Sequence, residues 1–300
     1  MLTRITICYN YTHYVLSEYE LRKMDAIIIG GGPAGISCAI WLKKLGVECV
    51  LLEASAQLGG LQTRSPYENL WIPGVQGKTG QQVAASLADH AKAVGIDVRL
   101  GCPVLFVDGQ QVTSLVGTYS APYLVIATGS QPRTGGFTAS DRIIIGPGVG
   151  METLDVKGRR VAIFGGGDNA FDQARFVRDR GGEVTIFSRS APRAQKLLQD
   201  MIPDVPVVVG PYQADQDAMT INSEAFDAFG VMFGFEAVVP DGLALDLDNG
   251  YVRVDRFGET SEPGVYACGE VTDYWHPCVT TSAAHGIQVA KQISKKLQEQ

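Results

Sequence analysis

The stretch Ile27-Ile28-Ile29-Gly30-Gly31-Gly32-Pro33-Ala34-Gly35 decides the fold of this chain. A short apolar run ends in glycines, and an amphipathic segment follows at once. If the run is a buried parallel strand, the turn after it brings backbone N–H groups and a helix N-terminus to one point, which suits a pyrophosphate. In that arrangement Gly30 allows the tight turn, Gly32 lets the phosphates approach the backbone, and Gly35 lets the helix pack on the strand.

The residues after this turn complete a dinucleotide-binding unit. Residues 36–45 have apolar side chains on more than one face, as in a helix buried against a sheet, and Gly46 stands where helices commonly end. Residues 47–52 are predicted to form a second buried strand, and Glu53 follows Gly30 by 23 residues. This spacing is near the roughly 20 residues expected for the acid that binds a ribose hydroxyl. The order of these features indicates a dinucleotide site.

A second unit of the same kind begins at Arg160. The apolar run 160–164 is followed by Gly165-Gly166-Gly167-Asp168-Asn169-Ala170, a predicted helix to about Arg180, and a predicted strand at 184–187. Ser188 follows Gly165 by 23 residues and takes the position of the acid in the first unit. Two βαβ units with matching spacing predict an α/β fold with two Rossmann-like dinucleotide-binding domains.

The second unit has arginines where the first has its acid. Ser188 is followed by Arg189, and Arg193 lies nearby. A missing acid together with arginines favours a ribose that carries a 2′-phosphate. The alternative is that both arginines belong to a solvated face.

Three further patterns predict local structure. Thr79 and Gln82 have the spacing of a capping box at a helix start. Asn249-Gly250 is typical of a hairpin turn between the β-like runs 243–247 and 251–254. Thr281 and Ser282 are predicted N-caps of the last helix. Tyr67 and Trp71 lie in an irregular stretch, where periodicity alone favours packing within the loop.

Composition narrows the classes of function. The 300 residues suffice for two domains, and 45% hydrophobic with 19% charged residues is typical of a soluble globular protein. The formal net charge of −7 argues against a general nucleic-acid or anionic-membrane binder. No apolar run approaches the roughly 18 residues needed to span a bilayer. We therefore expect neither a nucleic-acid nor a membrane partner, and no metal site is predicted.

The cysteines and the first residues bear on the cellular setting. Six cysteines, at positions 8, 38, 49, 102, 268 and 278, form no C-x-x-C and no dense framework, which favours a reducing, cytoplasmic setting. Polar residues interrupt residues 1–23, so a signal peptide is not predicted. Because Met24 directly precedes the first strand, we interpret residues 1–23 as an N-terminal extension, either dispensable or an over-long start.

The order of the motifs from Met24 onward resembles the low-molecular-weight thioredoxin reductases, within the pyridine nucleotide-disulfide oxidoreductase superfamily. The motifs are GGGPAG at 30–35, GGLQ at 59–62, YENLWIPG at 67–74, ATG at 127–129, GGGDNA at 165–170 and GVYACGEV…TTSAAHG within 264–286. The resemblance implies an FAD domain split between 24–130 and 237–300, with a second nucleotide-binding, NADPH-like domain at 131–236 inserted in it. It also implies a homodimer.

The resemblance further implies which residues line the FAD. The family usually has Asp where this chain has Glu270, which keeps the carboxylate but lengthens its arm by one methylene. The helix near Thr281 would direct its positive end at the flavin pyrimidine. The cofactor-binding residues implied are Gly30, Gly32, Pro33, Ala34, Gly35, Glu53, Gly60, Leu61, Asn69, Val107, Ala127, Thr128, Gly129, Gly269, Glu270, Cys278, Val279 and Ser282.

The chain departs from the family in two places. The redox C-x-x-C before the second glycine motif is missing, because residues 144–151 contain no cysteine. The signature H-R-R-x-x-x-R is reduced to Ser188-Arg189-Ser190 with Arg193 behind it. The second ligand is therefore either NADP(H) or a second FAD, as in the diflavin-linked disulfide oxidoreductases. The residues predicted for it are Gly165, Gly167, Asp168, Asn169, Ala170, Ser188, Arg189 and Arg193.

Two cysteines are candidates to replace the lost dithiol. Cys278 falls where the family usually has a flavin-contacting glutamine, and Cys268 lies ten residues earlier. A thiol beside a flavin can exchange with a substrate disulfide, especially if His276 lowers its pKa. The alternative is that each cysteine is a small buried apolar residue. Tyr274 and Trp275 either stack on the isoalloxazine or pack at a dimer interface.

Three functions follow, the first of which is favoured. It is an FAD-dependent oxidoreductase that resembles thioredoxin reductase without its C-x-x-C and passes electrons to a redox partner protein or a small disulfide. The second is an NADPH-dependent electron transferase like the ferredoxin–NADP reductases. The third is a non-catalytic redox or nucleotide sensor.

Overall fold

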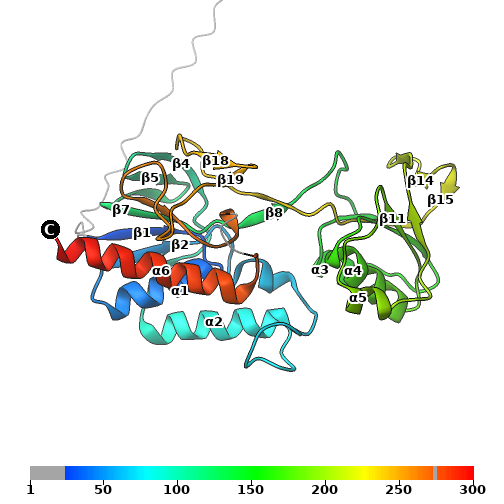
Figure 1. The fold of residues 1–300 in the computed structure, drawn as a ribbon, viewed down its shortest axis with the longest axis horizontal. Helices are drawn as coiled ribbons and strands as arrows, with labels where there is room; N and C mark the ends of the chain where they lie inside the picture. Colours follow the sequence, from blue (N-terminus) through cyan, green and yellow to red (C-terminus); the bar gives the residue numbers. More distant parts are fainter. Residues whose placement is uncertain (1–23, 273–275) are drawn as a thin grey trace, which may run out of the picture.

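The computed structural model describes residues 24–272 and 276–300, which form two lobes, each with a five-stranded parallel sheet (Figure 1). The sheet of the first lobe has the order β20-β7-β1-β2-β3. Its strands are β1 (Ala26–Ile29), β2 (Cys49–Leu52), β3 (Asp97–Arg99), β7 (Tyr123–Ile126) and β20 (Val265–Ala267). All pairs within it are parallel, and every residue of β1, β2 and β7 is buried, as expected for strands covered on both faces.

Helices cover one face of this sheet. The helices α1 (Pro33–Lys44), α2 (Gly80–Val94) and α6 (Val279–Gln298) lie side by side there (Figure 1). The other face is covered by the antiparallel sheet of β4 (Val104–Asp108), β5 (Gln111–Ser114) and β6 (Gly117–Ser120) and by the hairpin of β18 (Leu247–Asp248) and β19 (Tyr251–Val252). Each face has its own apolar cluster, so the first sheet lies between two cores.

The second lobe repeats the plan around the sheet β12-β11-β10-β16-β9. Its strands are β9 (Ile143–Ile145), β10 (Arg160–Phe164), β11 (Glu183–Ser188), β12 (Val207–Val209) and β16 (Ala228–Val231). The helices are α3 (Val149–Thr153), α4 (Asp168–Asp179) and α5 (Lys196–Asp200). A small sheet of β13 (Ala214–Asp215), β14 (Thr220–Ile221) and β15 (Glu224–Ala225) completes this lobe.

The chain passes between the lobes twice. The strand β8 (Ser130–Pro132) leads out of the first lobe, and β17 (Phe235–Ala237) returns to it and pairs with β8 antiparallel (Figure 1). These crossings lie at the boundaries of the predicted segments 24–130, 131–236 and 237–300. They support the predicted division of the chain into domains, which stays a prediction. Two short 3₁₀ helices, η1 (Gly60–Arg64) and η2 (Gly269–Val271), belong to the first lobe.

The structure confirms the two Rossmann-like units, and most of the local predictions agree with it. Thr79 and Gln82 form the capping box of α2. Asn249 and Gly250 make the β18–β19 turn with φ of 50° and 86°, although both strands are shorter than predicted. The predicted N-caps Thr281 and Ser282 are wrong, because Cys278 caps α6 and both residues lie inside the helix. Among the described residues, no helix is long and apolar enough to cross a membrane.

Candidate functional site

The first glycine turn brings strand, helix and neighbouring strand into close contact. Gly30 has a φ of +109°, and a Cβ at this position would overlap the carbonyl of Ala127 at the end of β7. A Cβ at Gly35 would overlap the carbonyl oxygen of Gly30. Both close approaches require glycine, so the turn has the shape that the sequence predicts for a phosphate cradle.

The N-terminus of α1 opens on this turn without a cap of its own. Its N-cap, Gly32, has no side chain to accept a hydrogen bond, Pro33 takes the first helical position, and the first turn has no acidic residue. The first N–H groups and the positive end of the helix dipole therefore remain available to an anion. A Cβ at Gly32 would find only the Cα of Gly60 within reach, at 3.8 Å, so the backbone is open to a pyrophosphate.

Glu53 closes the turn from the carboxyl end of β2. Its Oε2 accepts the N–H of Gly31 at 2.6 Å, and its Oε1 accepts the N–H of Ser55 at 2.7 Å. These bonds fix the carboxylate beside the turn and leave lone pairs on both oxygens. The cradle, the uncapped helix and the fixed acid together fit the adenosine-diphosphate part of a dinucleotide.

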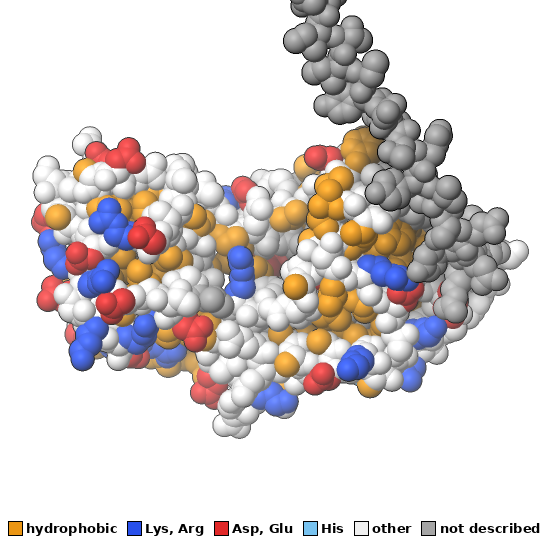
Figure 2. Space-filling view, turned by 180° about the vertical axis from the view of Figure 1, so that it is seen from behind, with side chains coloured by type: hydrophobic (Ala, Val, Ile, Leu, Met, Phe, Trp, Pro, Cys, Tyr) orange, Lys and Arg blue, Asp and Glu red, His pale blue; other side chains and the backbone are white. Residues whose placement is uncertain are grey.

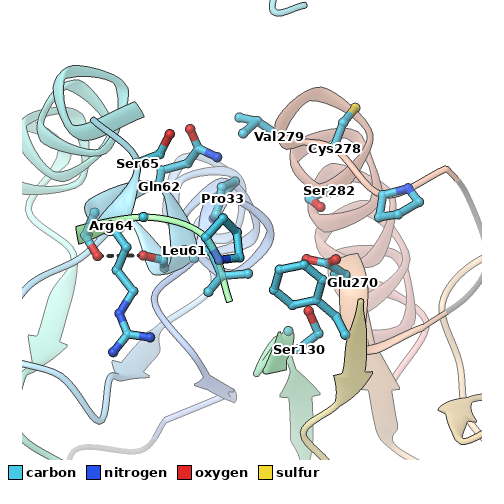
Figure 3. A pocket seen from close by; sticks show the side chains of 18 of the residues that line it. Pro33, Leu61, Gln62, Arg64, Ser65, Ser130, Glu270, Cys278, Val279 and Ser282 are labelled. Atoms are coloured by element: carbon cyan, nitrogen blue, oxygen red, sulfur yellow. Dashed lines mark hydrogen bonds between the residues drawn. The ribbon is translucent and has the colours of Figure 1, made fainter. Parts of the chain in front are cut away.

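A cavity of about 580 Å³ extends from this cradle toward the second lobe (Figure 3). Most of the predicted FAD residues line it, namely Gly30, Gly32, Pro33, Ala34, Glu53, Gly60, Leu61, Asn69, Ala127, Thr128, Gly129, Glu270, Cys278, Val279 and Ser282. Gly35, Val107 and Gly269 do not line it. The prediction for Val107 conflicts with this geometry, because Val107 is fully buried in the core under the sheet and its N–H donates to the carbonyl of Asp241.

Glu270 and Gly269 form a turn at the inner wall of the cavity. Burial raises the pKa of the Glu270 carboxyl, and the neighbouring Ser130 hydroxyl opposes that rise. Figure 3 shows these two side chains next to each other. Gly269 has a φ of +79°, and its N–H donates to Nδ1 of His285, which is buried in α6. The turn is therefore held from behind by the helix.

Cys278 caps α6 at the rim of the cavity. Its Sγ accepts the N–H of Thr281 at 3.4 Å, and its own N–H donates to the Thr281 hydroxyl at 3.1 Å. Partial burial acts to raise the pKa of this thiol, but hydrogen bonds from the Thr281 hydroxyl and from the N–H groups of Thr281 and Thr280 outweigh it and lower the pKa. In Figure 3 Val279 points across the cavity toward Gln62, whereas the Cys278 sulfur points away from it.

The two candidate thiols have opposite environments. Cys268 is fully buried, and burial raises the pKa of its thiol to about 12. Cys278 is exposed, and both cysteines are free. The carbonyl of His276 accepts the Thr281 hydroxyl at 2.6 Å, and His276 itself is exposed and lies outside the cavity lining. Tyr274 and Trp275 lie outside the described residues.

The cavity is also lined by residues that the sequence alone assigns to loop packing and not to the site. Tyr67, predicted to pack only within its loop, reaches the second lobe, where its hydroxyl donates to Oε1 of Gln173 on α4 at 2.8 Å. Its ring meets Phe176 edge-on, with centroids 5.0 Å apart, and burial raises its pKa to about 12. Trp71 also lines the cavity and is 56% exposed. The sequence around Tyr67 and Trp71 has no periodicity, so it gives no signal from which a contact between the lobes could be predicted.

The segment at the position of the missing dithiol also contacts the first lobe. Pro147 and Gly148 line the cavity, and a Cβ at Gly148 would overlap the carbonyl oxygen of Arg64. The backbone here therefore takes the room that a larger side chain would need. From the same lobe, Asp172, Gln173 and Arg175 of α4 line the cavity.

A second cavity of about 270 Å³ lies at the second glycine turn. The guanidinium of Arg189 stacks on the Phe233 ring at 5.4 Å from its centroid, and Oγ of Ser188 donates to the carbonyl of Ser190 at 2.7 Å. Asp168 at the start of α4 accepts the backbone N–H and the side-chain amide of Gln195. The predicted residues that line this cavity are Gly165, Gly167, Asp168, Asn169, Ser188, Arg189 and Arg193.

One residue of the predicted set does not line the second cavity. Ala170 is instead fully buried in the core of the lobe. Asn169 lines both cavities, so the two sites meet at the first turn of α4. Within the described ranges, no group of three or more His, Cys, Asp or Glu side chains is placed to hold a metal ion.

Comparisons with known proteins agree with this geometry. Residues 24–205 match the family model of the pyridine nucleotide-disulphide oxidoreductases. The chain is 31% identical to a ferredoxin–NADP reductase of Limosilactobacillus fermentum, over 84% of this chain and 87% of the relative, and 26% identical to a thioredoxin reductase of Listeria monocytogenes, over 93% and 96%. The fold is similar to the crystal structure of Lactococcus lactis thioredoxin reductase in its FR conformation, with a TM-score of 0.81, 21% identity and coverage of 93% and 100%. The chain therefore belongs to the pyridine nucleotide-disulphide oxidoreductase family and is a flavin-dependent oxidoreductase.

Proposed function

We propose that this chain is an FAD-dependent oxidoreductase that passes electrons to a disulfide or another redox partner without a dithiol of its own. One observation carries the proposal. The large cavity joins a complete dinucleotide cradle to the second lobe, and at the place of the family's dithiol it is bounded by Pro147 and Gly148. A thioredoxin reduction that depends on two adjacent thiols at this place is not available to the chain.

The residues of the first cradle have distinct roles in this proposal. The open N-terminus of α1 binds the pyrophosphate, and the carboxylate of Glu53 binds the ribose hydroxyls. Glu270 and the N-terminus of α6 are placed further along the cavity to hold the rest of the cofactor. When bound, FAD supplies the two-electron redox chemistry that the side chains lack.

Cys278 is the candidate thiol for substrate exchange. Of the cysteines in the described ranges it alone is exposed, and it lies on the cavity rim with a lowered pKa. In this role its thiolate attacks one sulfur of a substrate disulfide and forms a mixed disulfide, while the other sulfur leaves as a thiolate. We expect Cys278→Ser to abolish turnover with small disulfides while FAD stays bound. Unchanged turnover assigns Cys278 to helix capping alone.

A second candidate function is an NADPH-dependent electron transferase like the ferredoxin–NADP reductases. Arg189 and Arg193 both line the second cavity, where they are available to a 2′-phosphate, and the relative at 31% identity bears that name. The alternative ligand of this cavity is a second FAD, which the missing acid and the reduced arginine signature also allow. A non-catalytic redox or nucleotide sensor would bind FAD without turnover.

Quantifying released flavin and then titrating with NADPH under anaerobic conditions separates these functions. One FAD per chain with rapid bleaching by NADPH supports the transferase, and two FAD per chain support the diflavin form. One FAD per chain without bleaching at millimolar NADPH indicates that the electron donor is a compound other than NADPH. Purified protein that binds no FAD overturns the proposal, and bound FAD without turnover with any donor and acceptor supports the sensor.

We also propose that the chain acts as a cytoplasmic homodimer. Seen from behind, the first lobe carries a gathering of hydrophobic side chains (Figure 2). The large exposed hydrophobic residues of this lobe include Leu105 and Phe106 on β4 and Leu115 and Val116 in the turn between β5 and β6. An exposed apolar face of this kind is typical of a protein–protein interface. Light scattering of the purified protein tests the assembly, and a monomeric mass contradicts it.

A further inference from the structure

Gln173 has an unusual environment in the wall of the larger cavity. The residue is 1% exposed, and its Oε1 accepts the Tyr67 hydroxyl across the lobes at 2.8 Å. Its Nε2 is buried and has no hydrogen-bond partner among the described residues. A buried amide donor without a partner carries the full cost of its lost hydration, so such a group calls for a ligand.

The position of Gln173 indicates where that ligand comes from. Asn169 lines both cavities, and Gln173 follows it by one helical turn on α4 and lines the larger cavity. A nucleotide bound at the second glycine turn that extends past Asn169 therefore reaches Gln173 with the end remote from its adenine. Residues i and i+4 share one face of a helix, so both amides lie along one path.

We propose that Gln173 is a positioning residue that binds the ring end of the nucleotide held in the second cavity. The proposal rests on the function proposed above. The ligand group recognised belongs to a planar ring and has a carbonyl oxygen beside an N–H group. The carbonyl oxygen accepts the free Nε2–H of Gln173. Both candidate nucleotides present this group, the nicotinamide carboxamide of NADP(H) and the pyrimidine edge of a second FAD.

Tyr67 orients the amide for this contact. With Oε1 engaged by the Tyr67 hydroxyl, the Nε2 end is fixed on the other side of the amide plane. Phe176 on the next turn of α4 holds the Tyr67 ring edge-on at 5.0 Å. The first lobe thus sets the direction of a donor that belongs to the second lobe, and the ring end of the nucleotide is read only when the lobes are together.

The test compares Gln173→Met with Gln81→Met, which makes the same change on the exposed face of α2. The probes are NADP⁺ and 2′-phospho-ADP-ribose, which lacks only the nicotinamide ring, both titrated into the FAD-loaded protein. We expect Gln173→Met to weaken NADP⁺ binding about fivefold, the effect of one net hydrogen bond, and to leave 2′-phospho-ADP-ribose binding unchanged. If the second ligand is FAD, the same variant instead lowers the released flavin from two per chain toward one.

The outcomes separate this proposal from the proposed function. Wild-type protein that binds no FAD contradicts the function itself. An FAD-loaded wild type with Gln173→Met binding NADP⁺ equally well, at unchanged flavin content, overturns only the role of Gln173. Equal weakening of both probes also overturns it, because the effect is then a general loosening of the lobe. Tyr67→Phe is expected to weaken NADP⁺ in the same selective way, to a smaller degree.

Discussion

At the scale of single residues, Glu53 is the acid on which the FAD site depends. The spacing from Gly30 predicts a ribose-binding acid, and the structure shows the same carboxylate holding the cradle in shape. Its two oxygens accept the N–H groups of Gly31 and Ser55 at 2.6 and 2.7 Å. One side chain therefore both shapes the turn and remains available to the ligand.

We expect Glu53→Gln to raise the FAD dissociation constant about tenfold or more. The amide loses the negative charge that strengthens both hydrogen bonds, and its NH₂ group faces an N–H donor. Glu48→Gln is the matched control, because Glu48 is exposed and pairs with Lys43 outside the cavity. The check is fluorescence titration of the apoprotein with FAD, and equal affinities of the two variants contradict the role of Glu53.

His285 is the residue that links this site to pH. It is 2% exposed in α6, its Nδ1 accepts the N–H of Gly269, and burial lowers its pKa to about 4. The unfolded chain takes up a proton at its ordinary pKa of about 6.5, while the folded chain does not until about pH 4. Stability from this group is therefore complete above about pH 6.5 and is lost as the pH falls toward 4.

We expect this group to lower the free energy of unfolding by about 2 kcal/mol between about pH 7 and pH 5. His285→Gln removes that part of the pH dependence, because glutamine does not titrate. Urea unfolding of both proteins at the two pH values measures the difference. An identical pH dependence in wild type and variant shows that His285 does not carry it.

At the scale of elements, the strands and helices that follow local patterns were predictable and the contact between lobes was not. Apolar runs, glycine turns and the Thr79 capping box are short-range signals, and the strands of both glycine units and the start of α2 appear where these signals predict them. The start of α6 is not predictable from the sequence, because threonine, which lies inside the helix at position 281, is a preferred N-cap type and cysteine is not. The pairing of Tyr67 with Gln173 spans 106 residues, and no periodicity encodes it.

The segment that replaces the dithiol region makes a close backbone contact with the other lobe. Gly148 has a φ of +115°, and a Cβ there would overlap the carbonyl oxygen of Arg64 in the other lobe. Gly210 offers a matched control, because its φ is +130° and nothing lies within 4 Å of a Cβ built on it. The two glycines thus separate backbone strain from contact between the lobes.

We expect Gly148→Ala to lower the free energy of unfolding by about 1–3 kcal/mol more than Gly210→Ala, since only the first adds an overlap to the strain. The variant is also expected to expose Tyr67, because the lobes must separate to make room. Urea unfolding gives the free energy of unfolding. Hydrogen exchange at the backbone amides around Tyr67, or limited proteolysis, measures the exposure of Tyr67. Equal losses in the two variants contradict a tight contact at Gly148.

At the scale of the whole molecule, two copies of one βαβ plan meet at a shared wall. The sequence predicts both cradles from their glycines and spacing, because that geometry is local to each unit. It does not predict that Asn169 lines both cavities, or that the backbone at Gly148 closely approaches the carbonyl of Arg64. Those features depend on how the lobes are placed, and contacts far apart in the sequence, such as the β8–β17 pair and the Tyr67–Gln173 hydrogen bond, help to fix that placement.

The central claim is that electrons pass through bound FAD without a dithiol in this chain. Anaerobic titration with dithionite, followed by flavin absorbance and normalised to released FAD, tests it most directly. We expect uptake of about two electrons per bound FAD, because the five cysteines within residues 24–272 and 276–300 are free thiols that form no disulfide. Uptake of about four electrons per FAD reveals a further two-electron centre and contradicts this claim.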